Sequence, residues 1–280
     1  MTARLWKIGD AVVDLSKRAM IMGVLNVTPD SFSDGGKFFT ADAAVEHGIL
    51  MATEGADIID VGGESTRPGA EPVSVDEELK RVVPVVEKLR AKIDITISID
   101  TSKSDVAEAA LDAGAAIIND VTAGRGDDQM LPLVATRRAA LVLMHMQGEP
   151  RTMQKNPHYD DVIREVGDFF RQQYDRAIEC GVDPMALAFD PGIGFGKTLE
   201  HNLSLLKNLN QLRVDDRPLA VGVSRKSFLG KLLGSKEMAD RVGPTAAMTS
   251  LLRAHGADVI RVHDVKENVA ALRMSEEMLR

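Results

Sequence analysis

Cysteine is nearly missing from this chain, whose 280 residues include only Cys180. A single thiol excludes a disulfide within the chain and the usual cysteine-based zinc sites, and it is typical of the reducing cytosol. Long apolar runs are missing as well, since none approaches the roughly 18 residues that a membrane-spanning helix requires. Met1 to Asp10 carries scattered charge and no apolar core of signal-peptide length. We therefore expect a cytoplasmic protein with no membrane partner.

Positive charge is also in short supply, because 34 lysines and arginines stand against 42 aspartates and glutamates, a net charge of -8. General binding to nucleic acid needs a basic face, so we expect no nucleic-acid partner. An anionic substrate must then be met by local cationic side chains. No stretch has the Pro, Gly and Ser content of a linker, so residues 1–280 are predicted to form a single domain.

What the chain does contain is a regular alternation of short apolar strands and helical stretches. Eight such units predict a parallel sheet closed into a (β/α)8 TIM barrel, an α/β fold, with an open doubly wound sheet as the alternative. Residues 4–14 predict a short N-terminal β-hairpin that plugs the lower end of the barrel. Gly55, Gly114 and Gly256 each suit a left-handed helix C-cap just before a strand. The predicted strands are Met20–Asn26, Asp57–Val61, Ile95–Asp100, Ala116–Asn119, Ala140–His145, Ala186–Asp190, Leu219–Val223 and Asp258–Val262, and the predicted helices include Val75–Leu89, Asp105–Ala113, Asp161–Glu179 and Gly243–Ala254.

Nearly every predicted strand ends in side chains that hydrogen-bond or carry charge. A single aspartate at such a place is more often a helix N-cap or turn residue, and we interpret Asp105 and Asp264 in that way. In a (β/α)8 barrel, however, the carboxyl ends of all strands meet at one mouth, where the active sites of this fold lie. The strand ends are Asn26, Glu64–Arg67, Asp100–Lys103, Asn119–Asp120, His145, Asp190, Ser224–Lys226 and Arg261–Asp264.

Taken together, these segments resemble the dihydropteroate synthases, a family of pterin-binding enzymes of the folate pathway, nearly end to end. The loop after the first strand and the Ser-Thr-Arg-Pro-Gly loop after the second both match the family pattern. The matching segments are Asn26–Gly36, Asp60–Gly69, Ser98–Thr101, Ile118–Asp120, Met144–Gly148, Asp190–Lys197, Ser224–Ser227 and Arg261–Asp264.

The resemblance implies a transferase that joins (7,8-dihydropterin-6-yl)methyl diphosphate to p-aminobenzoate, giving 7,8-dihydropteroate and diphosphate. It also implies a Mg²⁺ cofactor and a homodimer, for which the late helix around residues 245–253 is the expected interface. The same resemblance implies that the protein is a target of sulfonamides.

The pterin site follows from matching residues to the family and from their chemistry. A pterin presents adjacent N–H donors, which the carboxylate of Asp190 can accept in bidentate fashion. The Asn119 amide can meet the rest of the pyrimidine edge, and Lys226 can donate to the ring carbonyl. Met144 and Phe195 would then line the faces of the ring.

The diphosphate site, by the same resemblance, is formed by Arg261, His263 and Thr66. Asn26 would hold a Mg²⁺ ion, which needs few protein ligands because it keeps most of its waters. Asp100 is expected to bind the pterin as well and to stabilise the pterin cation that forms as diphosphate leaves. The residues expected to be catalytic are Asp100, Asn26, Lys226 and Arg261.

The p-aminobenzoate pocket is expected to be formed by two loops and one helix start. Its predicted residues are Phe32, Thr66, Arg67, Pro68 and Ser227.

Other functions are weighed against this one. Gly196-Lys197-Thr198 ends like a phosphate-binding P-loop, but Pro191 stands where that pattern needs glycine. His145 is interpreted as supporting its loop, because no histidine pair has zinc-site spacing. A methyltetrahydrofolate-dependent methyltransferase and a catalytically silent pterin-binding paralogue are the remaining alternatives.

Overall fold

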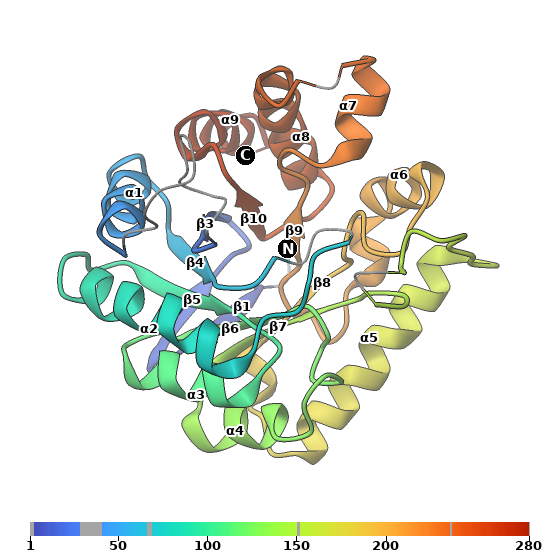
Figure 1. Cartoon of the computed structure of the whole chain (residues 1–280). Coiled ribbons are helices and arrows are strands. Elements are labelled where there is room, and N and C mark those ends of the chain that lie inside the picture. The colour runs from blue at the N-terminus through green and yellow to red at the C-terminus, as the bar shows by residue number, and fades with distance from the viewer. Residues whose placement is uncertain (1–2, 29–40, 66–68, 150–151, 236, 280) are drawn as a thin grey trace.

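The alternation of strands and helices produces a ring of parallel strands inside a ring of helices, seen in Figure 1 along the barrel. The computed structural model describes residues 3–28, 41–65, 69–149, 152–235 and 237–279. Strand order around the sheet is β8-β7-β6-β5-β4-β3-β10-β9, and the ring closes where Phe189 pairs with Leu219 in a parallel bridge. The (β/α)8 barrel is therefore confirmed. Its strands are β3 (Met20–Asn26), β4 (Ile58–Gly62), β5 (Thr96–Asp100), β6 (Ile117–Asp120), β7 (Ala140–Met144), β8 (Leu187–Asp190), β9 (Ala220–Gly222) and β10 (Val259–Val262).

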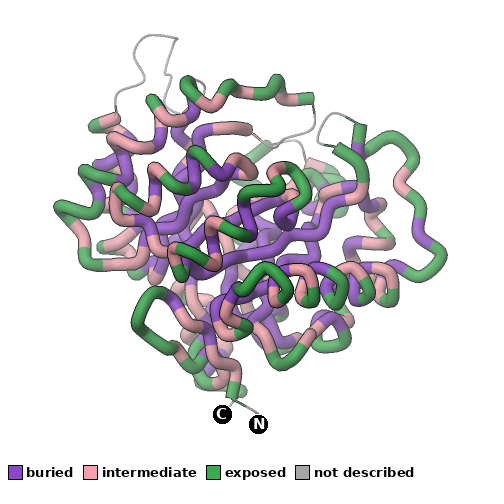
Figure 2. Tube along the Cα trace, turned by 90° about the horizontal axis from the view of Figure 1, so that it is seen from below, coloured by how far each residue is buried: buried purple, intermediate pink, exposed green. Residues whose placement is uncertain are grey.

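The eight predicted strands all exist, and most of their ends differ from the predicted ends by one residue. They are almost wholly buried, as strands of an all-parallel sheet covered by helices must be. Figure 2 shows this buried centre, with the exposed residues on the outer turns of helices and loops. The helices are α1 (Ala41–Thr53), α2 (Val75–Arg90), α3 (Ser104–Asp112), α4 (Met130–Arg137), α5 (Val162–Glu179), α6 (Leu199–Lys207), α7 (Ser227–Leu233), α8 (Val242–Ala254) and α9 (Val265–Leu279), with short 3-10 helices η1 (Pro184–Ala186), η2 (Leu209–Leu212) and η3 (Ala239–Arg241).

The predicted N-terminal hairpin consists of β1 (Leu5–Ile8) and β2 (Ala11–Asp14), paired antiparallel. Trp6 is fully buried in it, and its indole N–H donates to the carbonyl of Ala186 at 3.0 Å. The Trp6 side chain packs in one apolar cluster with residues near the starts of the barrel strands, among them Ile58 and Val259. The hairpin therefore plugs the amino-terminal end of the barrel and leaves the opposite end for a site.

Helix ends follow the predictions in part. Gly55, Gly114 and Gly256 have φ of 100°, 109° and 102°, the left-handed conformation that lets a helix stop directly before a strand. The interpretation of Asp105 as an N-cap is wrong, because α3 starts one residue earlier, with Lys103 in the cap position. Asp264 does directly precede α9, but its carboxylate pairs with Arg225. No helix of the described residues is long and apolar enough to cross a membrane.

Candidate active site

The lumen of the barrel changes from apolar to polar along its axis because alternate residues of each strand point inward. On β4, for example, Ile58 joins the apolar plug, whereas Asp60, two residues on, takes part in a charged network. Across the sheet, Asn26 pairs with Gly62, Gly62 with Asp100, and Asp100 with Asn119. The register therefore brings three predicted site residues to one level at the mouth.

The centre of this mouth is an arginine held between two carboxylates. Arg261 of β10 donates through Nε to Asp60 Oδ2 and through Nη2 to Asp100 Oδ2, both at 2.6 Å. Asn119 Nδ2 also donates to Asp60 Oδ2, at 3.0 Å. Asp60 is fully buried, and its Oδ1 has no hydrogen-bond partner among the described residues. Three of the predicted site residues thus share one hydrogen-bond network.

Asp60 is the residue of this network that sequence reasoning missed. Its signal was present, since a carboxylate in the middle of the apolar run Ile58–Gly62 must find a partner to be buried. The partner lies 201 residues away along the chain, however, and is reached only through the closure of the barrel.

Burial sets the charge state of Asp100. It raises the pKa of this carboxyl to about 7, with the nearby Asp60 adding to the rise and Arg261 opposing it. The proton therefore leaves Asp100 in the neutral range, far above the usual range for an aspartate.

A second polar group lies on the β8 and β9 side of the mouth. Asp190 is buried at the end of β8, and its Oδ1 accepts a hydrogen bond from the Gly192 N–H at 2.7 Å. Its Oδ2 accepts no hydrogen bond from another described residue, so it can face a ligand. Lys226 follows β9, donates to the carbonyl of Ile193, and lies 4.9 Å from the centre of the Phe195 ring. Burial lowers the pKa of Lys226 to about 8 and raises that of Asp190, while their mutual attraction favours both charged forms.

An apolar wall stands beside these charges. Met144, Met146 and Val121 cluster together, and Phe195 packs against them. Met144 pairs in register with Asp190, so an apolar surface lies next to the carboxylate. A cavity of about 210 Å³ opens at this level. It is lined by Glu64, Ser65, Ala70, Pro72, Glu78, Asp100, Thr101, Ser102, Val121, Thr122, Met146 and Glu149.

Hydrogen bonds connect the segments that follow β9 and β10. Ser224 Oγ accepts from the backbone N–H of His263 at 3.1 Å and lies 3.0 Å from its ring Nδ1. The neighbouring Arg225, with φ of 57°, pairs with Asp264. This arrangement brings His263 and Lys226 to adjacent loops. Ser227 is exposed in the first position of α7.

Asn26 is the predicted magnesium ligand and ends β3 at the mouth. Its side chain has no hydrogen bond to another described residue, so its amide oxygen is free to bind a cation. The described residues contain no group of three or more His, Cys, Asp or Glu side chains that could hold a metal. One amide oxygen with waters suits Mg²⁺, which keeps several of its waters in proteins.

Phe32, Thr66, Arg67 and Pro68, the other predicted contacts to p-aminobenzoate and diphosphate, lie outside the described residues. Their assignment stays a prediction.

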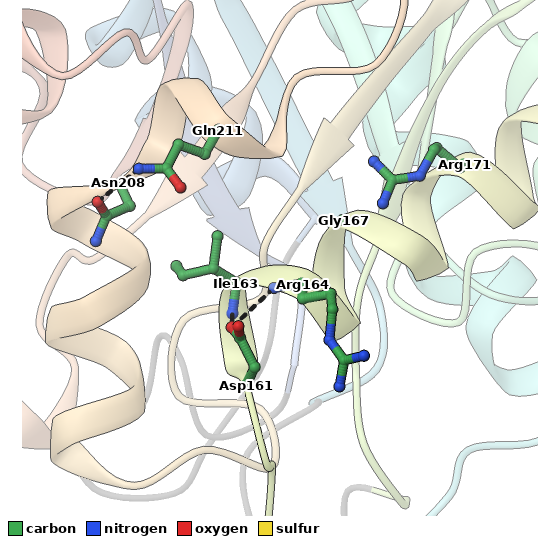
Figure 3. A pocket seen from close by; sticks show the side chains of 7 residues that line it. All are labelled: Asp161, Ile163, Arg164, Gly167, Arg171, Asn208 and Gln211. Carbon is green, nitrogen blue, oxygen red and sulfur yellow. Dashed lines mark hydrogen bonds between the residues drawn. The ribbon is translucent and has the colours of Figure 1, made fainter.

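Figure 3 shows a different hollow, of about 410 Å³, on the outer side between α5 and the segment after α6. Several of its polar groups are used within the fold: Asp161 caps α5 by accepting from the N–H groups of Ile163 and Arg164, and Gln211 donates to Asn208. The convergent, buried and unsatisfied polar groups lie instead at the barrel mouth, which is the candidate active site. The lining residues of the outer hollow are Asp161, Ile163, Arg164, Gly167, Arg171, Asn208 and Gln211.

Comparison with known proteins agrees with this geometry. The family described as pterin binding enzyme matches residues 22–263, which include all the barrel strands except the first two residues of β3. The chain belongs to the pterin-binding enzyme family. Within that family its curated relatives include dihydropteroate synthases. The Synechocystis enzyme of that name is 45% identical over 273 residues, covering 98% of this chain and 94% of the relative.

Solved structures give the same result. The Yersinia pestis dihydropteroate synthase in a sulfonamide complex superposes with a TM-score of 0.92 at 44% identity, over 98% of this chain and 99% of that one. The Xanthomonas albilineans dihydropteroate synthase with 4-aminobenzoic acid gives a TM-score of 0.92 at 44% identity, over 99% of both chains.

Proposed function

We propose that the chain catalyses the dihydropteroate synthase reaction of folate biosynthesis, condensing (7,8-dihydropterin-6-yl)methyl diphosphate with 4-aminobenzoate. The observation that carries this proposal is that a carboxylate oxygen of Asp190 with no hydrogen bond from a described residue lies in the same site as Lys226, beside the apolar wall of Met144 and Phe195. A flat ring with adjacent N–H donors and a carbonyl fits this combination of charges and apolar faces.

The pterin is held by its polar edge. Asp190 accepts the N–H groups of the amidine-like edge, Asn119 meets the pyrimidine, and Lys226 donates to the ring carbonyl. Because Asp190 and Asn119 are buried and Lys226 is half-buried, a ring that leaves one of them unmatched incurs a desolvation penalty, which gives the site its specificity.

The reaction replaces a C–O bond by a C–N bond at the methylene carbon. The C–O bond breaks first, its electron pair leaves with diphosphate, and the remaining cation is delocalised over the pterin. The lone pair of the aromatic amine then forms the new C–N bond, and one amine proton is lost. The amine is already neutral near pH 7, so no strong base is needed.

Asp100 is proposed to stabilise the cation when ionised. It lies at the mouth, and Arg261 holds one of its oxygens. Arg261 and His263, on alternate positions at the end of β10, are proposed to meet the diphosphate. A fixed charge aimed at developing charge of the opposite sign accelerates the chemical step.

Asn26 is proposed to hold Mg²⁺ through its unengaged amide oxygen. When bound, the ion neutralises negative charge on the departing diphosphate. Exchanging Asn26 for alanine should raise the Mg²⁺ concentration needed for half-maximal rate without changing the affinity for free pterin.

We also propose a homodimer formed through α8 and α9, and a cytoplasmic location. Leu251, Met274 and Met278 are exposed apolar side chains on these two neighbouring helices, 52%, 67% and 81% accessible. Light scattering on the purified protein tests the dimer, and Leu251→Glu should shift it toward monomer; a monomeric wild-type protein would overturn this proposal.

The activity itself is tested by following diphosphate release and dihydropteroate formation with Mg²⁺, with and without 4-aminobenzoate. Dihydropteroate should form only with both substrates, and a sulfonamide should compete with the amine. A protein that binds pterin tightly without turnover would be a silent paralogue instead. Turnover of a methyl-folate substrate would indicate the methyltransferase.

A further inference from the structure

Lys197 is a buried cation that the proposed reaction does not use. It is 3% exposed, at the end of the loop after β8, and its Nζ has three acceptors around it. Nζ lies 2.9 Å from His145 Nδ1 and donates to the carbonyls of Phe195 at 3.0 Å and His145 at 3.3 Å. An ammonium group has three donors, so all three are used within the protein.

These acceptors belong to the two loops that follow β7 and β8. The loops approach so closely that only glycine fits at two contacts. A Cβ at Gly192, with φ of 62°, would lie 1.9 Å from the His145 carbonyl oxygen. At Gly196, with φ of 65°, it would lie 2.4 Å from the carbonyl oxygen of Gln147. Lys197 therefore joins two backbones that are already in contact.

The same two loops carry the apolar wall of the pterin site. Met144 and Met146 flank His145 on one side, and Phe195 lies two residues before Lys197 on the other. The ring of His145 is itself fixed, edge-on to Phe169 with 4.8 Å between ring centres. A change at Lys197 would thus be transmitted to both parts of this wall through the His145 and Phe195 carbonyls, to which Lys197 is hydrogen-bonded.

We propose that Lys197 is a positioning residue that clamps the loops after β7 and β8 together, fixing the apolar wall of Met144, Met146 and Phe195 against which a flat bicyclic ring packs. This role rests on the proposed function. Lys197 also brings a positive charge close to Asp190, and this charge favours the ionised form of Asp190.

The contacts do not depend on one protonation state. Burial lowers the pKa of Lys197 to about 7 and that of His145 to about 2, so the imidazole is neutral in the physiological range. A charged Lys197 donates to Nδ1, whereas a neutral amine can accept a hydrogen bond from Nδ1–H. The groups that act on the charge of Lys197 are Asp190, which favours it, and Lys226, which opposes it.

The test compares Lys197→Met with wild type in steady-state kinetics and in calorimetric binding of 6-hydroxymethylpterin. The KM for the pterin diphosphate and the Kd for the free pterin should rise together by about ten- to a hundredfold, the cost of losing hydrogen bonds to a charged group. The KM for 4-aminobenzoate should stay within about twofold, since the residues predicted to bind that substrate belong to other segments. Lys197→Arg, which keeps the charge, should restore part of the pterin affinity.

Arg213→Met is the matched control, because Arg213 is a buried cation whose partner, Asp258, precedes β10 at the opposite end of the barrel. It should lower the melting temperature and leave both KM values unchanged.

If Lys197→Met lowers the melting temperature like the control but leaves pterin affinity intact, the proposal is overturned. If it does not fold, Tyr159→Phe, which removes the hydrogen bond to the Gly196 carbonyl at 3.0 Å, should raise the pterin KM more weakly, and no change would overturn it. Failure of the proposed function would show differently, as a wild-type protein without turnover.

Discussion

At the scale of single residues, the mouth of the barrel is governed by how many carboxylates share one arginine. Asp60 and Asp100 both bind Arg261, so neither has a full counter-charge. Asp60 is fully buried, whereas Asp100 lies nearer the opening. The structure thus separates a carboxylate that holds the arginine from one that can face a substrate.

Replacing Asp100 by asparagine should lower kcat about a hundredfold or more while pterin binding changes little, because its charge matters most as the cation forms. In the wild type, kcat/KM should rise with pH through about 7, where Asp100 ionises. That limb should vanish in Asp100→Asn, as pH–rate profiles would reveal. A variant with a pure affinity defect would contradict the assignment.

Asp60→Asn gives an independent test of the same group. The charge of Asp60 helps to raise the pKa of Asp100, and its removal also gives Arg261 wholly to Asp100. Both effects lower the pKa of Asp100, so the acid limb of the profile should move to lower pH. An unchanged limb would mean that another group titrates there.

At the scale of elements, the loop after β4 is attached to the neighbouring helices by charge. Lys103, before α3, pairs with Glu64 of this loop and with the fully buried Glu78 of α2. Glu64 Oε1 also accepts from the Val73 N–H at 3.4 Å, and Arg81 donates to the Gly63 carbonyl at 2.8 Å. Through these contacts Glu64 supports its loop.

Lys103→Met should lower the free energy of unfolding by about 3 kcal/mol, because it leaves the Glu78 carboxylate buried without a counter-charge. Urea denaturation measures this. Lys88→Met is the matched control, since Lys88 pairs with Asp42 at the surface, where a salt bridge contributes about 0–1 kcal/mol. Adding Glu78→Gln to Lys103→Met should recover stability, and a lack of recovery would show that the charge is not the cause.

At the scale of the whole molecule, stability and catalysis are concentrated at opposite ends of the barrel. The hairpin around Trp6 fills one end, and the charged network occupies the other. Trp6→Ala should therefore reduce the free energy of unfolding by about 3–5 kcal/mol while KM for both substrates is unchanged. Chemical denaturation and kinetics on the folded variant test this; altered KM values would mean that the two ends are coupled.

The fold was predictable because its signals are local. Apolar strands, left-handed glycines such as Gly114 and polar strand ends all occur within a few residues of the features they define. The hydrogen-bond network around Asp60 was not predictable from the sequence, because its partners meet only when β4 and β10 are placed around one lumen. The contact of Ser224 with His263, 39 residues apart, was missed for the same reason. Lys197 was weighed only as part of a P-loop, since neighbouring sequence could not show that its partner is His145. The assignments of residues 32 and 66–68 stay predictions.

The closure of the ring has a consequence for its motion. Within the described part of the chain, β8 is joined to the segment that starts β9 only by the Phe189–Leu219 bridge, in which the Phe189 N–H donates to the Pro218 carbonyl, whereas the other neighbours have continuous ladders. Asp190 lies on one side of this seam and Lys226 on the other. A pterin held by both would act as a non-covalent crosslink across the weakest join of the barrel. Bound pterin would thereby hold β8 and β9 together. Amide hydrogen exchange at β8 and β9 should therefore slow when the pterin binds.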